Sequence, residues 1–200
     1  MEIYADWVGF CATLKAIENI EIPRFILGEC KQKIQIHGFA DASEKACGCY
    51  IYLRSENGDY VNTRLLCAKS KVAPLKITTI PRLELCACLH FAKILTIVKG
   101  SLTLDLHKIY LWTDSKIVLA WLNSNAGTLK TIVANRIIEI QAVTNLEQWH
   151  HVKSKDNPAD LLTRELNGNE LKDLKVQSHT VLVGNVEEFL IFQRFSNLHY

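Results

Sequence analysis

Three apolar runs follow one another closely in the first part of the chain, at 34–41, 47–53 and 60–70. The first run alternates apolar and polar residues and ends at Asp41, and the pair Asn57-Gly58 between the second and third is typical of a tight turn. Links this short join neighbouring antiparallel strands. The sequence therefore predicts an antiparallel meander of three strands, which restricts the chain to a fold built around a sheet.

A long helix is predicted after the third strand. Apolar residues recur at helical spacing over 83–98, and the segment ends near Gly100. Thr78 and Thr79 stand just before Pro81, a pattern that favours a helix start because threonine caps helices and proline fits their first turn. A connection of this length permits a parallel crossover to the next strand.

The remaining elements follow from the same patterns. We expect a strand at 104–114, helices within 115–125 and 130–145, a strand at 148–152 and a last helix at 158–166. The predicted fold class is α/β, with a mixed five-stranded sheet (three antiparallel strands, then two parallel ones) and helices on both faces. Before the sheet, residues 1–30 contain a short helical pattern that is broken at Ile22 to Arg24. We interpret this segment as a connector.

Four carboxylates lie in or beside apolar segments, each near the start or end of its element: Asp41, Glu84, Asp114 and Asp160. If the first and fourth strands are neighbours, Asp41 and Asp114 lie side by side, with the two helix starts above them. Acids this close raise one another's pKa unless cations lie between them. Mg2+ suits such oxygen ligands when substrate phosphates complete its shell, and a pair of ions can position a water for attack on a phosphodiester.

Each acid also has an ordinary structural interpretation. Asp114, which precedes Ser115, could cap a helix, and Asp160 could complement a helix dipole. Glu84 could be a solvated helix residue, and Asp41 could belong to a turn. Taken singly, these alternatives are favoured, whereas the order and context of the four acids together favour the metal site.

Composition narrows the classes of partner. The formal net charge is +2, so a polyanion would have to be bound by local patches or through metal ions at acidic clusters. No apolar run approaches the roughly 20 residues that cross a bilayer, and residues 1–7 lack the features of a signal peptide. With 48% apolar residues, the chain is expected to be a soluble, intracellular protein with no membrane partner.

The seven cysteines are odd in number and lie mostly in apolar stretches. This usage suits buried free thiols in a reducing compartment. A zinc site is the alternative, but the Cys-x-Cys pairs lack the usual Cys-x2-Cys spacing, and the side chains of Cys86 and Cys88 diverge on a helix. We therefore expect no zinc.

Four stretches together resemble one known family: "GFADASEKACGCYIYLR", "TIPRLELCACLHFAKIL", "LWTDSKIVLAWL" and "WHHVKSKDNPADLLTREL". They are similar to the RNase H domain of Pao/BEL-type retrotransposon polyproteins. The resemblance covers 34–166, and it implies that 1–33 is a connector from a reverse transcriptase and 167–200 a linker toward an integrase region. The acid order Asp, Glu, Asp, Asp agrees with RNase H and differs from the Asp, Asp, Glu order of integrase and transposase cores.

The resemblance implies endonucleolytic hydrolysis of the RNA strand of an RNA–DNA hybrid during reverse transcription. It assigns two Mg2+ ions, with Mn2+ as a substitute, to Asp41, Glu84, Asp114 and Asp160, and it requires no small-molecule cofactor. Selectivity for RNA would come from contacts with 2′-hydroxyls. The implied partners are the hybrid and the reverse transcriptase and integrase regions of the same polyprotein, in a cytoplasmic virus-like particle or the nucleus.

Four more residues are candidates for substrate binding: Ser43, Ser115, Asn157 and Arg164. For three of them an alternative stays open, because Ser115 could cap a helix, Asn157 could shape its loop and Arg164 could be a solvated helix residue.

The sequence departs from the family pattern in two places. The "KSKDNPAD" stretch lacks the histidine that many RNase H enzymes carry before the last aspartate, and neither His150 nor His151 is a clear substitute. Lys130 and Arg136 are the cations available where some cellular relatives have a strongly basic handle. We therefore expect weak hybrid binding by this chain alone.

Two other functions stay open at this point. One is a catalytically inactive or domesticated scaffold that keeps the fold to bind nucleic acid or to hold neighbouring domains. The other is a nuclease or transferase of the integrase kind, which the acid order disfavours.

Overall fold

The computed structural model describes residues 2–18, 26–27, 33–57, 60–74, 76, 78–164 and 167–170. Its strands are β1 (Lys33–Ala42), β2 (Ala46–Asn57), β3 (Tyr60–Val72), β4 (Leu106–Thr113) and β5 (Trp149–His151). Its α-helices are α1 (Glu2–Leu14), α2 (Ile80–Ser101), α3 (Lys116–Leu122) and α4 (Thr131–Gln141). Five 3-10 helices join or extend them: η1 (Lys15–Ile17), η2 (Ala126–Thr128), η3 (Leu146–Gln148), η4 (Ser154–Asp156) and η5 (Pro158–Thr163).

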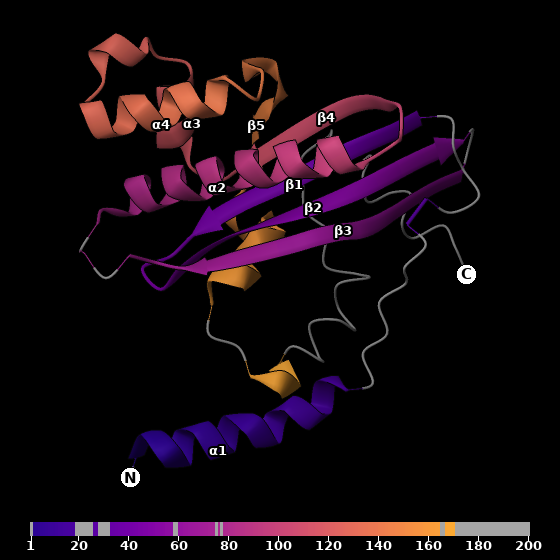
Figure 1. The fold of residues 1–200 in the computed structure, drawn as a ribbon, viewed down its shortest axis with the longest axis vertical. Coiled ribbons are helices and arrows are strands. Elements are labelled where there is room, and N and C mark those ends of the chain that lie inside the picture. The colour runs from indigo at the N-terminus through magenta and orange to yellow at the C-terminus, as the bar shows by residue number, and fades with distance from the viewer. Residues whose placement is uncertain are drawn as a thin grey trace.

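The strands form one mixed sheet in the order β3-β2-β1-β4-β5. The β1–β2 and β2–β3 pairs are antiparallel, whereas β1–β4 and β4–β5 are parallel, so the predicted sheet is confirmed. The helix α2 makes the crossover from the edge strand β3 to β4, on the far side of β1. As Figure 1 shows, α2 lies along the sheet, with α3 and α4 on the same side of it.

The main core lies between the sheet and α2. Alternate residues of β1 and β2 face this helix, which buries its own apolar stripe against them. Phe91 of α2 packs edge-on against Trp149 of β5, at a ring-centroid distance of 5.9 Å. Gly38 of β1 lies directly under the Phe91 ring, so the helix approaches the strand where a side chain is missing.

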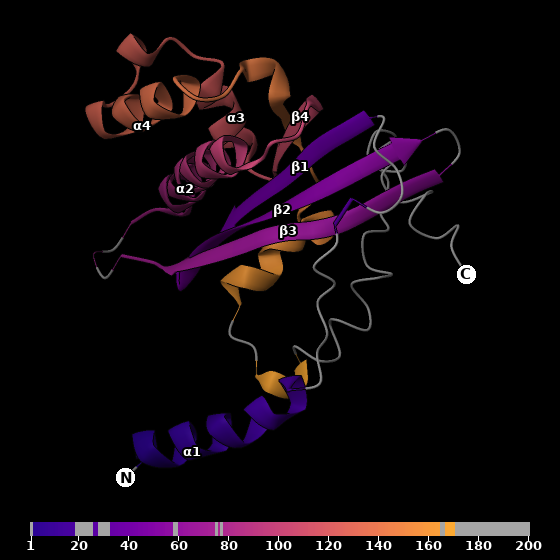
Figure 2. The ribbon, with the colours of Figure 1, turned by 45° about the vertical axis from the view of Figure 1, so that its right-hand side comes forward.

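The opposite face of the sheet carries a smaller apolar cluster that includes Phe39, Trp112 and Ala159. The 3-10 helix η5 packs on β1 and β2 at this face, on the side of the sheet away from α2 (Figure 2). Gly48 of β2 makes room for Leu162 of η5. The two layers therefore hold segments from different parts of the chain against the same strand β1.

The predicted last helix at 158–166 is wrong in type and extent. The structure has a 3-10 helix at Pro158–Thr163, while residues 165 and 166 lie outside the described part. Side-chain and packing contacts with the sheet, described below, hold this segment and take precedence over its helical pattern. The expected helix start before Pro81 is confirmed, but Thr79 makes no capping side-chain bond there.

Other expectations fall partly outside the description. Gly58 of the predicted turn, the Ile22 to Arg24 break and residues 171–200 are not described. The six described cysteines are free thiols, and three of them, Cys47, Cys49 and Cys88, are buried. Within the described ranges, no helix combines the length and the apolar character that crossing a membrane requires.

Replacing Gly38 by Ala should destabilise the protein, because the new methyl group overlaps the ring of Phe91 inside a packed core. We expect the free energy of unfolding in urea to fall by about 1–3 kcal/mol. Gly100→Ala is the matched control: its methyl group meets nothing within 4 Å, and it lies inside α2, where alanine is the better helix former. Equal stabilities for the two variants would contradict this account of the α2–β1 approach.

Candidate active site

Asp41 and Asp114 are brought together by the parallel pairing of β1 with β4. Ala40 lies opposite Thr113 in the register, so the next residue on each strand is one of the two acids. Asp41 is buried, with 8% of its surface exposed, and Asp114 is half-buried. The charge of Asp114 raises the pKa of Asp41, which agrees with the expectation from the sequence that the two carboxylates are neighbours.

Glu84 reaches the same region from the first part of α2. Ser115 Oγ donates a hydrogen bond of 2.6 Å to Glu84 Oε2 and accepts one of 3.2 Å from the backbone N–H of Val118. Ser115 therefore caps α3, as one sequence alternative had it, and in addition ties the β4–α3 turn to α2. Its hydroxyl serves two structural partners at once.

Asp160 lies on η5, and Asn157 fixes this segment to the end of β1. The Asn157 side chain donates through Nδ2 to the carbonyl of Ala40 at 3.1 Å and accepts through Oδ1 from the N–H of Ala159 at 3.2 Å. Only 4% of Asn157 is exposed. These contacts support its loop-shaping alternative.

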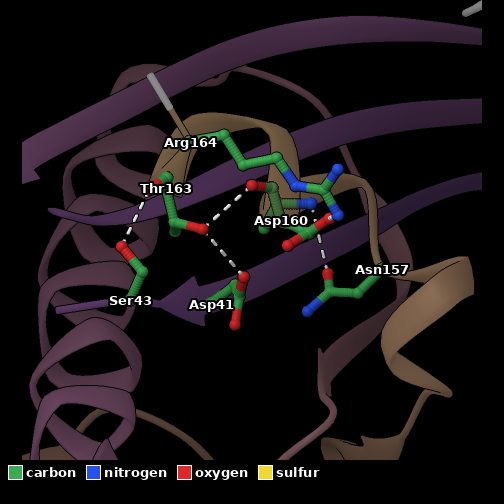
Figure 3. A network of polar contacts seen from close by, with 7 residues as sticks. Asp41, Ser43, Asn157, Asp160, Thr163 and Arg164 are labelled. Atoms are coloured by element: carbon green, nitrogen blue, oxygen red, sulfur yellow. Dashed lines mark hydrogen bonds and ion pairs between the residues drawn. The ribbon is translucent and has the colours of Figure 1, made fainter. Parts of the chain in front are cut away.

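Thr163 connects Asp160 to Asp41, and the sequence interpretation missed it. Its Oγ1 lies 3.2 Å from Asp41 Oδ2 and 2.9 Å from the carbonyl oxygen of Asp160, and its own carbonyl accepts a hydrogen bond of 2.8 Å from Ser43 Oγ (Figure 3). The residue is 3% exposed. A threonine three positions after an acid does not by itself indicate a site residue. Thr163 reaches Asp41 only because the 3-10 turn packs against the sheet.

Ser43 and Arg164 lie at the open edge of the site. The Ser43 hydroxyl also accepts hydrogen bonds from the backbone N–H groups of Lys45 and Ala46, so it organises the turn between β1 and β2. Arg164 is largely exposed and forms an ion pair with Asp160. A shallow cleft of about 570 Å³ opens here, lined by Ser43, Glu44, Lys45, Ile80, Thr163 and Arg164.

The acids interact through their charges. The pKa of Asp41 is raised to about 6, chiefly by burial and then by the charges of Asp114 and Asp160, while hydrogen bonds from Ala42 and Thr163 act in the opposite direction. Burial also raises the pKa of Glu84, opposed by the Ser115 hydrogen bond and supported by the charge of Asp114. The site therefore accumulates negative charge that only a cation or a proton relieves.

The donor set suits hard divalent cations. Asp114 Oδ1 is buried and has no hydrogen-bond partner within the described part of the chain, as expected of an oxygen that awaits a metal ion. No three or more acidic, histidine or cysteine side chains are already assembled to hold an ion among the described residues. Glu84 and Asp160 instead engage Ser115 and Arg164, so these two carboxylates would have to exchange partners to join a metal ion.

The order β3-β2-β1-β4-β5, with acids at the ends of β1 and β4 and on the elements that flank them, defines a ribonuclease H-like domain. The chain belongs to the Pao retrotransposon-like RNaseH-like domain family, whose model matches residues 1–115. The matched span includes α1 and three of the acids, Asp41, Glu84 and Asp114. No curated protein matches the chain.

Solved structures with similar folds include RNase H proteins of three sources. LC11-RNase H1 from compost, in complex with an RNA/DNA hybrid, is 18% identical at a TM-score of 0.47, covering 70% of this chain and 99% of that one. The N-terminal RNase H domain of a Mycobacterium tuberculosis protein is 16% identical at a TM-score of 0.44, covering 73% and 97%. RNase H1 of Halobacterium salinarum is 15% identical at 0.40, covering 71% and 99%.

The raised pKa of Asp41 predicts how stability depends on pH in metal-free protein. Between the unfolded-state value, about 3.9, and the folded value, about 6, the folded chain retains a proton that the unfolded chain has lost. The contribution of Asp41 to stability therefore falls as pH rises through this window and stays low above it. Asp41→Asn should remove this dependence, so that the variant gains on the wild type from pH 4 to pH 7.

Urea unfolding in EDTA from pH 3.5 to 7.5 measures this difference. The difference between the two proteins should widen from about pH 4 to about pH 6 and then stay constant, and this plateau is the internal control. A difference that narrows over this range would contradict the arrangement of acids described here.

Thr163→Val removes the hydroxyl that contacts Asp41 while keeping the shape of the side chain. We expect the free energy of unfolding to fall by about 1–2 kcal/mol, because Asp41 loses a buried hydrogen-bond donor. Thr163→Ser keeps the hydroxyl and should therefore avoid most of that loss of stability. If the valine variant proves as stable as the serine variant, the hydroxyl does not hold Asp41.

Proposed function

We propose that this chain is a ribonuclease H that hydrolyses the RNA strand of RNA–DNA hybrids during the reverse transcription of a retrotransposon. The observation that carries the proposal is the placement of Asp41 and Asp114 on adjacent strand ends, with Glu84 and Asp160 held beside them by α2 and η5. Membership in the retrotransposon family supports this activity. So does the fact that one similar fold was solved with an RNA/DNA hybrid.

In this proposal the four carboxylates are ligands of two divalent ions, Mg2+ with Mn2+ as a substitute. Such ions, when bound, supply an activated water and stabilise the leaving oxygen of a phosphodiester. The protein's part is to hold the ligands in place. Thr163 fixes Asp41, Ser115 holds Glu84 until it binds, and Asn157 keeps the η5 segment against β1.

Substrate would enter beside Ser43 and Arg164, where the cleft is open. If Asp160 were a ligand of such an ion, the Arg164 guanidinium would lose its carboxylate partner and would be available for a phosphate. Recognition of RNA is assigned to 2′-hydroxyl contacts, which a DNA strand cannot offer. Ser115 and Asn157 then act on substrate through the acids and the loop that they position.

The wider context is part of the same proposal. Residues 34–166 form the catalytic domain, 1–33 connect to a reverse transcriptase region, and 167–200 lead toward an integrase region. Reverse transcriptase would supply much of the grip on the hybrid. The site of action would be a cytoplasmic virus-like particle or the nucleus. Support for this context comes from the family to which the chain belongs.

Incubation of the protein with an RNA–DNA hybrid and Mg2+ tests the activity. We expect cleavage of the RNA strand, and Asp114→Asn should slow it by roughly 100-fold or more, as loss of a group that stabilises transition-state charge does. Asp105→Asn is the matched control, because this exposed acid lies just before β4, at its other end, and should cleave like the wild type. An uncut hybrid with both Mg2+ and Mn2+ would reject the proposal.

A non-catalytic scaffold is the second candidate. It is favoured by the fact that the described residues hold no preassembled group of three metal-binding side chains. Calorimetric titration with Mg2+ separates the two functions. A nuclease should give binding heat that Asp114→Asn abolishes, whereas a scaffold should give no heat that depends on the acids.

A further inference from the structure

The chain lacks the strongly basic segment of some cellular relatives and has only Lys130 and Arg136 in that region. Arg136 donates a hydrogen bond of 2.9 Å to the carbonyl of Ile132 on its own helix. The four acids of the site add negative charge that repels the phosphates of a substrate. With a formal net charge of +2, any compensating positive charge has to be concentrated locally.

Such a concentration lies at the edge of the sheet beside α2. Lys69 and Lys71 of β3 are paired with Cys49 and Cys47 of β2, two residues whose side chains belong to the core beneath α2. Side chains of directly paired residues lie on the same face, so both lysines lie on the α2 side. The helix itself packs on β1 and β2, which leaves the edge strand β3 beside it (Figure 1).

This edge is near the acids. Asp41 is paired with Gly48, and Gly48 is paired with Ser70, which lies between the two lysines. Two strand spacings separate Asp41 from Ser70, or about 10 Å. A duplex carries one negative charge per about 1.7 Å of its axis, so roughly six charges lie within that distance. The side chain of Asp41 faces the η5 layer, whereas the two lysines lie on the face that α2 covers. A duplex that contacts both groups therefore has to pass the end of the sheet where these positions lie.

No ion pair neutralises the two lysines in the part of the chain that the structure describes. Lys69 and Lys71 are both exposed. Lys93, the next cation along α2, does pair with Glu139 at 2.7 Å. The pKa of His90 on α2 is lowered by burial and then by the charges of Lys71, Lys69 and Lys93, as expected where cations crowd together.

We propose that Lys69, Lys71 and His90 form a surface that binds the phosphate backbone of the RNA–DNA hybrid. We call it the β3–α2 basic surface. The proposal rests on the proposed function for the identity of the duplex, and it assigns part of the grip to this chain itself. The lysines supply charge, and the His90 ring adds a hydrogen-bonding group beside them. The contacts are with phosphates, so they carry no base specificity.

The experiment compares two double variants of equal charge change, Lys69→Gln with Lys71→Gln, and Lys33→Gln with Lys99→Gln. The control lysines are exposed and lie at the other ends of β1 and α2. Binding of a 30-base-pair RNA–DNA hybrid is measured in EDTA, to prevent cleavage, by fluorescence anisotropy at several salt concentrations. The first pair should bind roughly tenfold more weakly, and the slope of log affinity against log salt should become shallower by about two.

The control pair should keep the wild-type slope. Equal weakening in both pairs would mean a general charge effect and would overturn the proposal. So would an unchanged slope in the Lys69 and Lys71 pair, which would mean that these lysines contact no phosphate of the hybrid. Circular dichroism spectra and unfolding midpoints check that both pairs remain folded.

The outcome is independent of catalysis. If the wild type binds the hybrid through Lys69 and Lys71 but never cuts it, the proposed nuclease activity is wrong and the proposed β3–α2 basic surface is supported. If the wild type cuts the hybrid while the lysine variants bind it normally, the nuclease activity is supported and the proposed surface is wrong. Where cleavage occurs, the Lys69 and Lys71 variant should raise KM and leave kcat within about twofold, since contacts with phosphates other than the reacting one contribute uniform binding.

Discussion

The parallel pairing of β1 with β4 is the contact on which the rest of the site depends. It places Ala40 opposite Thr113 and so brings the following residues, Asp41 and Asp114, to one edge of the sheet. Those acids are 73 residues apart in the chain, and α2 makes the connection between their strands. The pairing costs free energy, because it leaves two carboxylates close together in a partly buried place. A fold optimised for stability alone would put apolar residues there.

The position of the fourth acid, Asp160, depends on side-chain hydrogen bonds to the sheet rather than on a strand or an α-helix. The η5 segment is short, and its attachment to the sheet runs through Asn157 and Thr163, both almost fully buried. These two residues bond the end of β1 from the side opposite α2. The candidate site is therefore assembled from both layers of the domain, with β1 between them. Displacement of either layer would separate the acids.

Charge is distributed unevenly over this small domain. The acids lie at the end of the central strands, while Lys69 and Lys71 lie on the edge strand with no described acidic partner. A polyanion that has to approach carboxylates needs attraction from elsewhere, and metal ions relieve only the repulsion at the acids themselves. Because the chain lacks a strongly basic segment elsewhere, we propose that the lysines of the edge strand β3 attract the polyanion.

Much of the fold was readable from the sequence. The three β-runs, the long helical stripe over 83–98 and the order of elements predicted the mixed sheet, because these signals are local periodicities. The helix predicted at 158–166 failed, since sheet contacts made through Asn157, Leu162 and Thr163 hold that segment in a tighter turn. The four acids could be predicted from their places at the starts and ends of elements, whereas the contact of Thr163 with Asp41 could not.

The sequence by itself determined the five strands, the long helix, the candidate acids and the family, because apolar periodicity and short motifs are properties of neighbouring residues. The tertiary structure alone decided which groups meet, namely Ser115 with Glu84 and Thr163 with Asp41. These contacts join residues that are distant in the chain, and their positions follow from strand register and from the packing of α2 and η5. No local pattern encodes such distances, because register is set by how the whole sheet buries its faces.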